Sequence, residues 1–387
     1  MKKKIAIVTK KMIIGGIERV LLSMLSEIDK SKYDITLFLE ERGGGLEQDI
    51  PSWVKVKYIF DDSNSIRKNF ISSLKKFDIK NTFKFMYSGL RIYLLDEEYK
   101  IYKDRCTILP KIQEKYDIAI SYHNPINLST IYVIDKINAN KKVMWIHTDI
   151  KEYINEVDYL KKYYYKYDKI FAVSPGSAKS FGEKYPDLKD KIEVFYNRMV
   201  KSEIVSKVDN KNYYDKFEGI KLLTVGRICY QKAIDLIPEV CKKLKDDGYK
   251  FRWYCVGWGG IEKIKELIKS QDVEDYFKLL GSKNNAYDYM KNCDIYVQPS
   301  RYEGYVTTIT EAKCFNRPIV ATNIEGIKEQ IVDNETGILV ECNVDDLYIG
   351  IKKLLDDKKL RDKLSINLSK ENIDTRSEIN KLYKLID

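Results

Sequence analysis

The sequence contains no long apolar run. No stretch of uncharged, apolar residues approaches the ~18 positions that a membrane-spanning helix needs. The first apolar segment, Ile5–Val8, is flanked by lysines and is too short for the core of a secretory signal peptide, so we expect a strand here and a cytoplasmic protein. Hydrophobic residues make up 44% of the 387 residues and charged residues 33%, a balance that excludes a disordered chain.

Patterns that bind metals or cofactors are also missing. The seven cysteines form no Cys-x-x-Cys pair, and with only two histidines no zinc-site spacing exists. We expect the cysteines to be buried, reduced thiols. The Gly-x-Gly-x-x-Gly fingerprint of dinucleotide-binding proteins is absent as well. The sequence therefore predicts neither a bound metal nor a cofactor.

Positive charge is concentrated in one segment. Lysine and arginine outnumber aspartate and glutamate by 68 to 58, and residues 64–95 hold seven basic residues and one acid among aromatic and aliphatic residues. The basic residues are Arg67, Lys68, Lys75, Lys76, Lys80, Lys84 and Arg91. Two interpretations stay open: an ordinary helical segment with a solvated basic face, or a segment drawn to an anionic membrane surface. Nucleic-acid binding is a third, but no recognition motif supports it, so we expect no nucleic-acid partner.

Short apolar runs alternate with segments of helical periodicity along the chain. We expect strands at Ile5–Val8, Ile35–Leu39, Val54–Ile59, Ile118–Ser121, Val143–His147, Ile170–Val173, Ile192–Phe195, Lys221–Val225, Trp253–Val256, Phe277–Leu280, Ile295–Gln298, Ile319–Thr322 and Ile338–Val340. We expect helices at Ile17–Ile28, Ser177–Lys184, Ile234–Lys245 and Ile261–Ser270. This alternation predicts an α/β fold with parallel sheets covered on both faces.

A polar stretch near Met199–Phe217 divides the chain into two halves and is expected to be a linker. We expect two Rossmann-like domains facing a cleft, at residues 1–200 and 201–370. A C-terminal helix at 371–387 is expected to pack back on the first domain. In such sheets ligands bind at the carboxyl ends of the strands, so the loops that follow the strands are the candidate sites.

Three of these loops have residues suited to an anionic ligand. Gly15-Gly16 precedes a helix whose N-terminus attracts anions, although the two glycines taken alone favour a plain tight turn. Gly226-Arg227 is followed by Lys232 just before a helix, so both cations can converge on one diphosphate unless they are ordinary surface charges. The glycines of residues 257–260 indicate a close backbone approach or a turn.

The loop after the strand at Ile295–Gln298 carries two carboxylates. Glu303 is expected in the loop and Glu311 about two turns into the following helix, facing the same side. Ionised carboxylates accept hydrogen bonds strongly and therefore suit sugar hydroxyls, while the amides from Gly304 to Thr307 would form a helix N-terminus that binds phosphate. A capping arrangement of two acids would have the same spacing.

These motifs in this order resemble those of the retaining GT-B glycosyltransferases of family 4. The motifs are Gly226-Arg227…Lys232, Gly257…Gly259, Glu303-x7-Glu311-Ala, Pro318-Ile-Val-Ala-Thr and Glu335-Thr-Gly-Ile-Leu-Val. The resemblance covers nearly the whole chain and is sharpest over Lys221–Glu341. It implies a nucleotide-sugar-dependent enzyme.

The resemblance also implies roles for individual residues. The implied catalytic residues are His147, Glu303, Arg227 and Lys232. The implied donor-binding residues are Gly15, Gly16, Gly226, Arg227, Lys232, Gly257, Ser282, Lys283, Glu303, Gly304, Tyr305, Val306, Thr307 and Glu311. Arg227 and Lys232 would neutralise the diphosphate, Glu311 would accept from the ribose hydroxyls, and Glu303 would hold hydroxyls of the donor sugar. His147 matches the histidine that lies beside the reacting sugar.

Three positions depart from the family pattern. The family often has Gly or Pro where Val306 stands, and usually has Gly where Ala233 and Asn316 stand. Asparagine tolerates a left-handed backbone, so Asn316 is a mild change. None of the departures removes a charged group.

The resemblance implies transfer of a hexosyl unit from a nucleotide sugar, a UDP-sugar by the family's habit, with retention of configuration. No Asp-x-Asp metal signature stands in a suitable loop, so Arg227 and Lys232 would replace a metal in stabilising the leaving group. The expected acceptor is a saccharide or lipid-linked saccharide in surface polysaccharide assembly, and the enzyme would be cytoplasmic or peripheral on the inner membrane face. The alternatives are a GT-B nucleotide-sugar epimerase and a non-catalytic partner subunit of a transferase.

Overall fold

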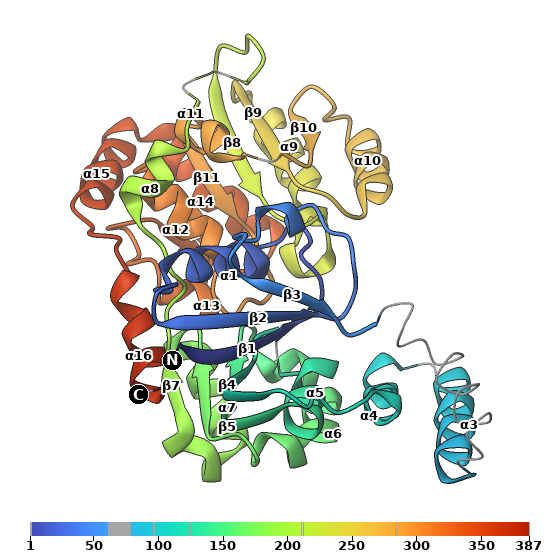
Figure 1. Ribbon diagram of the computed structural model, residues 1–387. Coiled ribbons are helices and arrows are strands. Elements are labelled where there is room, and N and C mark those ends of the chain that lie inside the picture. The colour runs from blue at the N-terminus through green and yellow to red at the C-terminus, as the bar shows by residue number, and fades with distance from the viewer. Residues whose placement is uncertain are drawn as a thin grey trace. The chain divides into compact units, whose positions relative to one another are not determined.

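The chain forms two compact units in a computed structural model (Figure 1). The structure describes residues 2–60, 79–95, 97–123, 125–209, 211, 213–283 and 285–386. One unit consists of Met1–Arg198 together with Arg376–Asp387, and the other of Met199–Thr375. Four of the seven basic residues in the segment at 64–95, those at 67, 68, 75 and 76, lie outside the described residues.

The first unit is built on a parallel sheet. Its strand order is β3-β2-β1-β4-β5-β6-β7. The strands are β1 (Lys3–Thr9), β2 (Tyr33–Leu39), β3 (Lys55–Tyr58), β4 (Lys115–Ser121), β5 (Asn138–Ile146), β6 (Lys169–Ala172) and β7 (Ile192–Val194). The helices are α1 (Gly16–Glu27), α3 (Ile79–Leu94), α4 (Glu98–Ile108), α5 (Leu128–Lys136), α6 (Ile154–Tyr164), α7 (Pro175–Lys184) and α16 (Ile379–Ile386). The order reverses between β1 and β4, which are neighbours in the sheet.

The second unit repeats this plan. Its parallel sheet has the order β10-β9-β8-β11-β12-β13, which reverses between β8 and β11. The strands are β8 (Ile220–Val225), β9 (Phe251–Val256), β10 (Phe277–Gly281), β11 (Ile295–Gln298), β12 (Ile319–Thr322) and β13 (Ile338–Val340). The helices are α8 (Lys201–Ser206), α9 (Ile237–Asp246), α10 (Ile261–Ser270), α11 (Tyr287–Asn292), α12 (Thr307–Cys314), α13 (Glu325–Lys328), α14 (Val344–Asp356) and α15 (Lys358–Ser369).

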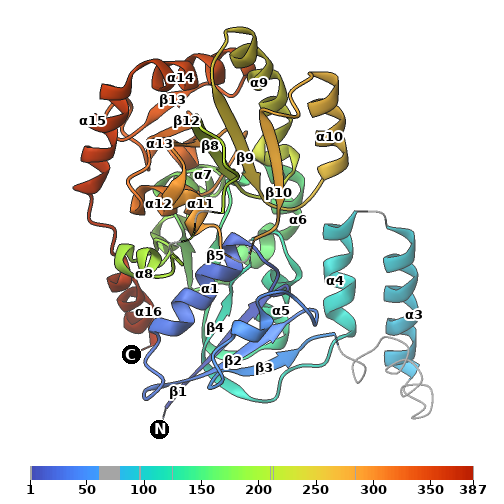
Figure 2. The ribbon, with the colours of Figure 1, turned by 90° about the horizontal axis from the view of Figure 1, so that it is seen from above.

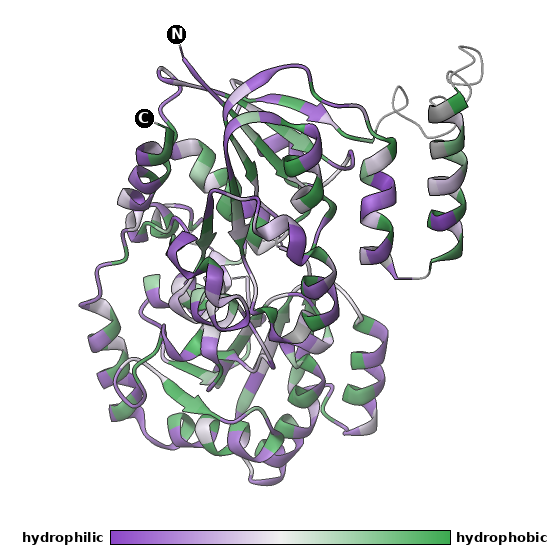
Figure 3. Cartoon of the chain, turned by 90° about the horizontal axis from the view of Figure 1, so that it is seen from below, coloured by the Kyte–Doolittle hydropathy of each residue, from purple (hydrophilic) through white to green (hydrophobic). Residues whose placement is uncertain are grey.

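Both faces of the second sheet are buried, which explains why its strands are apolar without alternation. Leu222 and Trp253 pack in one core cluster with residues of α9, α10 and α14, while the next residues, Leu223 and Tyr254, pack in another with residues of α8, α11 and α12. Hydrophobic colour accordingly runs along the strands in Figure 3. The prediction of two Rossmann-like parallel-sheet units is confirmed.

The structure differs from the sequence predictions in two places. The expected linker at Met199–Phe217 contains α8, because Ile204 is buried in the second unit's core. The helix expected over Ile234–Lys245 begins with a 3-10 turn over its first three residues, and α9 starts at Ile237 with Pro238 in its first turn. All seven cysteines are unpaired, as predicted, although Cys229 and Cys342 are only partly buried.

Candidate active site

In the second unit three of the predicted charged donor residues follow the two strands at which the sheet order reverses. The loop after β8 carries Arg227 and Lys232, and the loop after β11 carries Glu303. Because β8 and β11 are adjacent and parallel, both loops leave the same edge of the sheet. This position, the topological switch point, is where open α/β sheets bind their ligands.

Glycines let the loops after β8 and β9 touch. A Cβ atom on Gly257 would lie 1.8 Å from the carbonyl oxygen of Gly226, so no other residue fits there without moving the backbone. The two loops are also joined by a hydrogen bond from the Ile228 amide to the Trp258 carbonyl oxygen (2.7 Å). The close approach predicted for residues 257–260 therefore occurs, and it fixes the backbone on either side of Arg227.

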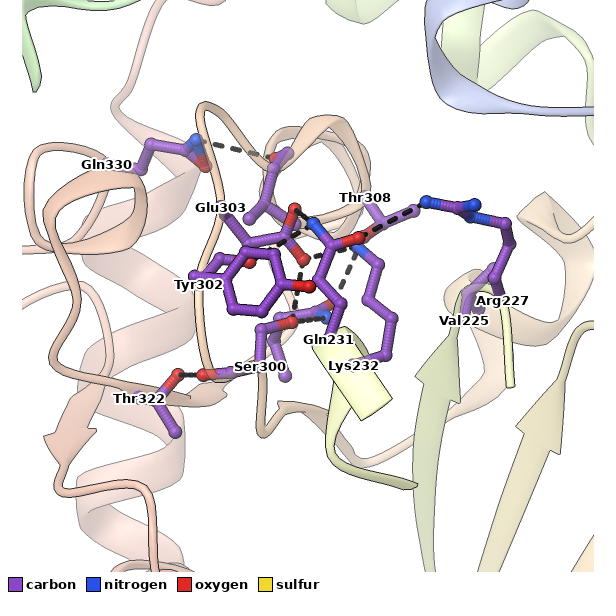
Figure 4. Close-up of polar contacts among 12 residues, drawn as sticks. Val225, Arg227, Gln231, Lys232, Ser300, Tyr302, Glu303, Thr308, Thr322 and Gln330 are labelled. Atoms are coloured by element: carbon purple, nitrogen blue, oxygen red, sulfur yellow. Dashed lines mark hydrogen bonds and ion pairs between the residues drawn. The ribbon is translucent and has the colours of Figure 1, made fainter. Parts of the chain in front are cut away.

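Lys232 and Glu303 form an ion pair that the sequence did not predict (Figure 4). Lys232 Nζ lies 2.5 Å from Glu303 Oε1, and both side chains are largely buried. The same carboxylate accepts hydrogen bonds from Ser300 Oγ (2.8 Å) and from Gln231 Nε2 (3.3 Å). Glu303 is thus oriented by three donors from two loops, and its negative charge is balanced inside the site.

The polar network continues below Glu303. Gln298 Nε2 donates to Ser300 Oγ (2.8 Å), and Thr322 Oγ1 donates to the Ser300 carbonyl oxygen (2.6 Å). Gln298 Oε1 accepts from Tyr296 (2.8 Å). Since Gln298, Ser300 and Thr322 are fully buried, these bonds hold the loop of Glu303 in one conformation.

Arg227 differs from Lys232 in its environment. Its side chain is exposed and donates to Gln231 Oε1 (3.2 Å). Of the two predicted diphosphate cations, one is therefore engaged by a buried carboxylate and the other points into solvent from the same loop.

Helix α12 begins directly after the loop of Glu303. The residue before its first turn, Val306, is buried and offers no side-chain cap to the helix amides. Glu311 lies in the second turn, where Tyr287 donates a hydrogen bond to its Oε1 (3.4 Å). Glu303 thus lies in the loop and Glu311 in the helix that follows it, and no side chain of Val306 occupies the amides at the helix start, a position at which phosphate can bind.

Two of the implied donor-binding residues, Ser282 and Lys283, follow β10. Gly281 ends the strand with a φ of 70°, and Ser282 and Lys283 after it are exposed. Their backbone is thus open at the same carboxyl edge of the second sheet.

In the first unit the corresponding edge holds a buried carboxylate that the sequence analysis missed. Gly15 precedes α1, and Glu18 in the first turn is 3% exposed, with Oε1 4.0 Å from His123 Nδ1. A Cβ atom on Gly15 would lie 2.4 Å from Glu18 Oε2, so a larger residue at 15 would displace this carboxylate. The available signal was that Glu18 shares a helix face with the apolar Leu21 and Leu25.

His147 follows β5 and packs against the ring of Tyr122, with ring centroids 4.7 Å apart. Burial, helped by the nearby His123, lowers the pKa of His147 to about 3, although a hydrogen bond with the Tyr122 backbone opposes the shift. The imidazole is therefore neutral at neutral pH. Its Nε2 is buried and has no hydrogen-bond partner among the described residues, so it can still bond to a ligand hydroxyl.

The departures from the family pattern have structural counterparts. Ala233 and Asn316 both have a positive φ, of 51° and 54°. Glycine adopts this backbone without strain, which explains its preference there. Within the described part of the chain, no group of three or more His, Cys, Asp and Glu side chains is placed to hold a metal ion.

Comparisons with known proteins agree with this geometry. Residues 210–371 match the model of the family described as glycosyl transferases group 1. A Campylobacter jejuni relative, N-acetylgalactosamine-N,N'-diacetylbacillosaminyl-diphospho-undecaprenol 4-alpha-N-acetylgalactosaminyltransferase, is 29% identical over 223 residues. The match covers 57% of this chain and 59% of that protein, less than two thirds of its length.

Solved structures match the full chain in fold. TarM of S. aureus, crystallised with UDP, Fondaparinux and alpha-GlcNAc-glycerol, has a TM-score of 0.72 at 16% identity and full coverage of both chains. HepE of Anabaena with UDP-glucose has a TM-score of 0.71 at 15% identity, with 98% of each chain covered. Residues 210–371 are therefore similar to the glycosyl transferases group 1 family, and the chain has the GT-B fold of two Rossmann-like units.

Proposed function

We propose that the protein is a retaining glycosyltransferase that moves a hexosyl unit from a UDP-sugar to a saccharide or lipid-linked saccharide in surface polysaccharide assembly. The observation that carries the proposal is the convergence of Arg227, the Lys232–Glu303 pair and the start of α12 at the switch point of the second sheet. Cations, helix amides and oriented carboxylates are the groups that bind a sugar diphosphate.

Two findings on similar proteins support the UDP-sugar donor and the lipid-linked acceptor. The TarM and HepE crystal structures are complexes with UDP and with UDP-glucose, which favours uridine as the base. The name of the Campylobacter jejuni relative specifies a diphospho-undecaprenol acceptor, which favours a lipid-linked saccharide.

The reaction breaks the bond between the anomeric carbon and the diphosphate oxygen, and the electron pair leaves with UDP. The acceptor hydroxyl forms the new carbon–oxygen bond on the same face of the sugar, and its proton passes to the departing phosphate. Arg227 and Lys232 stabilise the negative charge that develops on this phosphate, without a metal. Glu303 orients the sugar hydroxyls and Glu311 the ribose.

The geometry suggests how Lys232 acts. In the structure its ammonium is held by Glu303, so an incoming diphosphate has to share or take over this contact. The neutral imidazole of His147 accepts or donates one hydrogen bond to a substrate hydroxyl through Nε2 and carries no charge in the reaction.

Donor binding tests the proposal. A panel of UDP- and GDP-sugars is added to the wild type and to the Arg227→Ala, Glu311→Ala and Lys359→Ala variants while thermal unfolding is followed. A donor at a hundredfold excess over its Kd should stabilise the wild type by about 2.7 kcal/mol. Arg227→Ala and Glu311→Ala should lose this stabilisation.

Lys359→Ala is the control, because it removes an exposed positive charge from α15, a helix without predicted site residues. It should respond to the donor as the wild type does. If no nucleotide sugar stabilises the wild type, the proposal is wrong. If a donor is isomerised without any acceptor, the epimerase alternative replaces it.

A further inference from the structure

Helix α3 of the first unit leaves an apolar face exposed. Seven large apolar side chains of this helix are between 56% and 86% exposed. They are Ile79, Phe83, Met86, Tyr87, Leu90, Tyr93 and Leu94. Exposed apolar patches of this kind mark sites of protein or membrane interaction.

The seven side chains form one strip along the helix. At about 100° per residue, their positions fall within an arc of about 120°. The side of α3 that carries Ser88 packs on α4 and buries this residue. Arg91 lies between that side and the strip, where its charge is paired with Asp104 of α4 at 2.9 Å. The strip therefore faces away from the unit, and Figure 2 shows the α3–α4 pair standing beside the sheet with α3 outermost.

The strip has apolar residues at its centre and tyrosines at its edges, as expected for a helix that lies at a membrane interface. By the same angular spacing, Tyr87 and Tyr93 lie at its two edges, and Phe83, Met86 and Leu90 lie between them. Tyrosine favours the boundary between apolar and polar phases because its ring is apolar and its hydroxyl is polar. A helix lying in the plane of a bilayer would bury the centre of the strip and keep both tyrosines at headgroup level.

The charge of α3 is complementary to an anionic membrane. Residues 79–94 contain no aspartate or glutamate and include Lys80, Lys84 and Arg91. These three positions follow one another along the edge of the strip next to Tyr87, and Arg91 lies over the Tyr87 ring at 5.7 Å. Each basic residue near an anionic leaflet contributes about 1 kcal/mol of attraction. A strip that docked on an apolar protein groove would gain nothing from this one-sided charge.

We propose that the exposed strip of α3 binds the surface of an anionic membrane, with the helix axis in the membrane plane. This inference goes beyond the proposed function and does not depend on the donor or on the reaction. No helix among the described residues is long and apolar enough to cross a bilayer, so the contact proposed is with one leaflet only.

The test compares two double variants of the full chain. Met86→Ser/Leu90→Ser removes two residues of the strip that are 56% and 58% exposed. Ile366→Ser/Ile349→Ser removes two apolar residues from α15 and α14 with the same exposures, 56% and 58%. Both double variants therefore replace two apolar side chains of similar exposure with serine. Only Met86→Ser/Leu90→Ser alters the strip.

Binding is measured by co-sedimentation with vesicles of phosphatidylglycerol and phosphatidylcholine, and with vesicles of phosphatidylcholine alone. The wild type should bind the anionic vesicles more tightly, and added salt should weaken this preference. Met86→Ser/Leu90→Ser should lower the partition coefficient by at least about tenfold, because both side chains lose burial in the interface. Ile366→Ser/Ile349→Ser should leave it unchanged, and hydrogen exchange should slow across residues 79–94 when vesicles are present.

Three outcomes would overturn the proposal. One is equal vesicle binding by both double variants and the wild type. Another is exchange protection outside residues 79–94 only. In the third outcome, altering the strip changes the sedimentation velocity of the protein without vesicles but leaves vesicle binding unaffected. The strip would then bind a second copy of the chain. Arg227→Ala should bind vesicles normally, so failure of the membrane proposal and failure of the transferase proposal can be told apart.

Discussion

The side chains of Lys232 and Glu303 carry opposite charges and are largely buried, so their pairing is a condition of stability. Removing one partner of a buried ion pair leaves a charge without compensation, which costs roughly 3 to 5 kcal/mol. We predict that Lys232→Met lowers the free energy of unfolding of the second unit by this amount, measured by urea denaturation.

The double variant Lys232→Met/Glu303→Gln is the control for this prediction. It removes both charges, while the single amide oxygen of a glutamine at 303 can still accept from Ser300, which now donates to Oε1 of the carboxylate. The weaker bond from Gln231 to Oε2 is lost unless the Gln231 amide turns over. Most of the lost stability should return. A double variant as unstable as Lys232→Met alone would mean that lost packing, and not an unpaired charge, explains the cost.

His147 makes a prediction about pH. Its pKa is about 3 in the folded protein and about 6.5 in an unfolded chain. As the pH falls below 6.5, the unfolded state takes up a proton that the folded state refuses, so stability declines until the pH reaches about 3. His147→Gln should flatten this decline by up to about 1.4 kcal/mol per pH unit in unfolding measured between pH 6 and 4.

Parallel slopes for wild type and His147→Gln would contradict the lowered pKa. A constant offset between the two curves would not, because glutamine also changes the contacts with Tyr122 at every pH.

The charged residues of the site were predictable one by one, but not their partners. The loops after β8 and β11 carry Arg227, Lys232 and Glu303, and Glu311 lies inside α12, which follows the second loop. This order of strand, loop and helix is visible in the sequence. The ion pair between Lys232 and Glu303 joins residues that are 71 positions apart in the sequence. Such a contact depends on β8 lying next to β11, which no local pattern encodes.

At the scale of elements, the turn before α9 stores strain that can be relieved. Ala233 is buried with a φ of 51°, and a left-handed backbone costs an L-residue roughly 1 to 2 kcal/mol. Part of this is offset because glycine loses more chain entropy on folding. We predict that Ala233→Gly raises the free energy of unfolding by about 0.5 to 1 kcal/mol in urea denaturation.

Ala312 provides the opposite case. It is also fully buried, but it lies inside α12 with an ordinary helical backbone. Ala312→Gly should destabilise the unit by about 1 kcal/mol. If both variants lower stability, the strain assigned to Ala233 is absent.

Strands were easier to predict than the ends of helices. Each of the expected strands corresponds to an observed one. Most are apolar runs, because parallel strands in the middle of a sheet are buried on both faces, whereas the edge strand β3 alternates exposed and partly buried residues. The start of α9 and the existence of α8 were missed. A 3-10 turn has the same local residue types as a first helical turn, and α8 is short and depends on burying Ile204 against the second core.

For the whole molecule, the order of strands and helices along the chain could be predicted from the sequence. Contacts between parts of the chain that are far apart in sequence were harder to predict. The last helix, α16, belongs to the unit formed by the first half of the chain, where Tyr383 stacks on Tyr33 with ring centroids 4.9 Å apart. This pairing spans most of the sequence, so composition and periodicity suggest a helix there without identifying its partner.

One experiment tests directly whether the chain transfers a sugar. Purified wild type and Arg227→Ala are incubated, with a metal chelator present, with a labelled UDP-sugar and an undecaprenyl-diphosphate-linked saccharide. The products are then analysed by NMR at the anomeric carbon. For a retaining transferase, we predict that the wild type releases UDP only when acceptor is present. The glycoside that it forms should have the anomeric configuration of the donor. Removing one such preorganised donor group should slow Arg227→Ala by about 100-fold or more. Isomerised or hydrolysed donor with no glycoside formed, or a variant as active as the wild type, would contradict it.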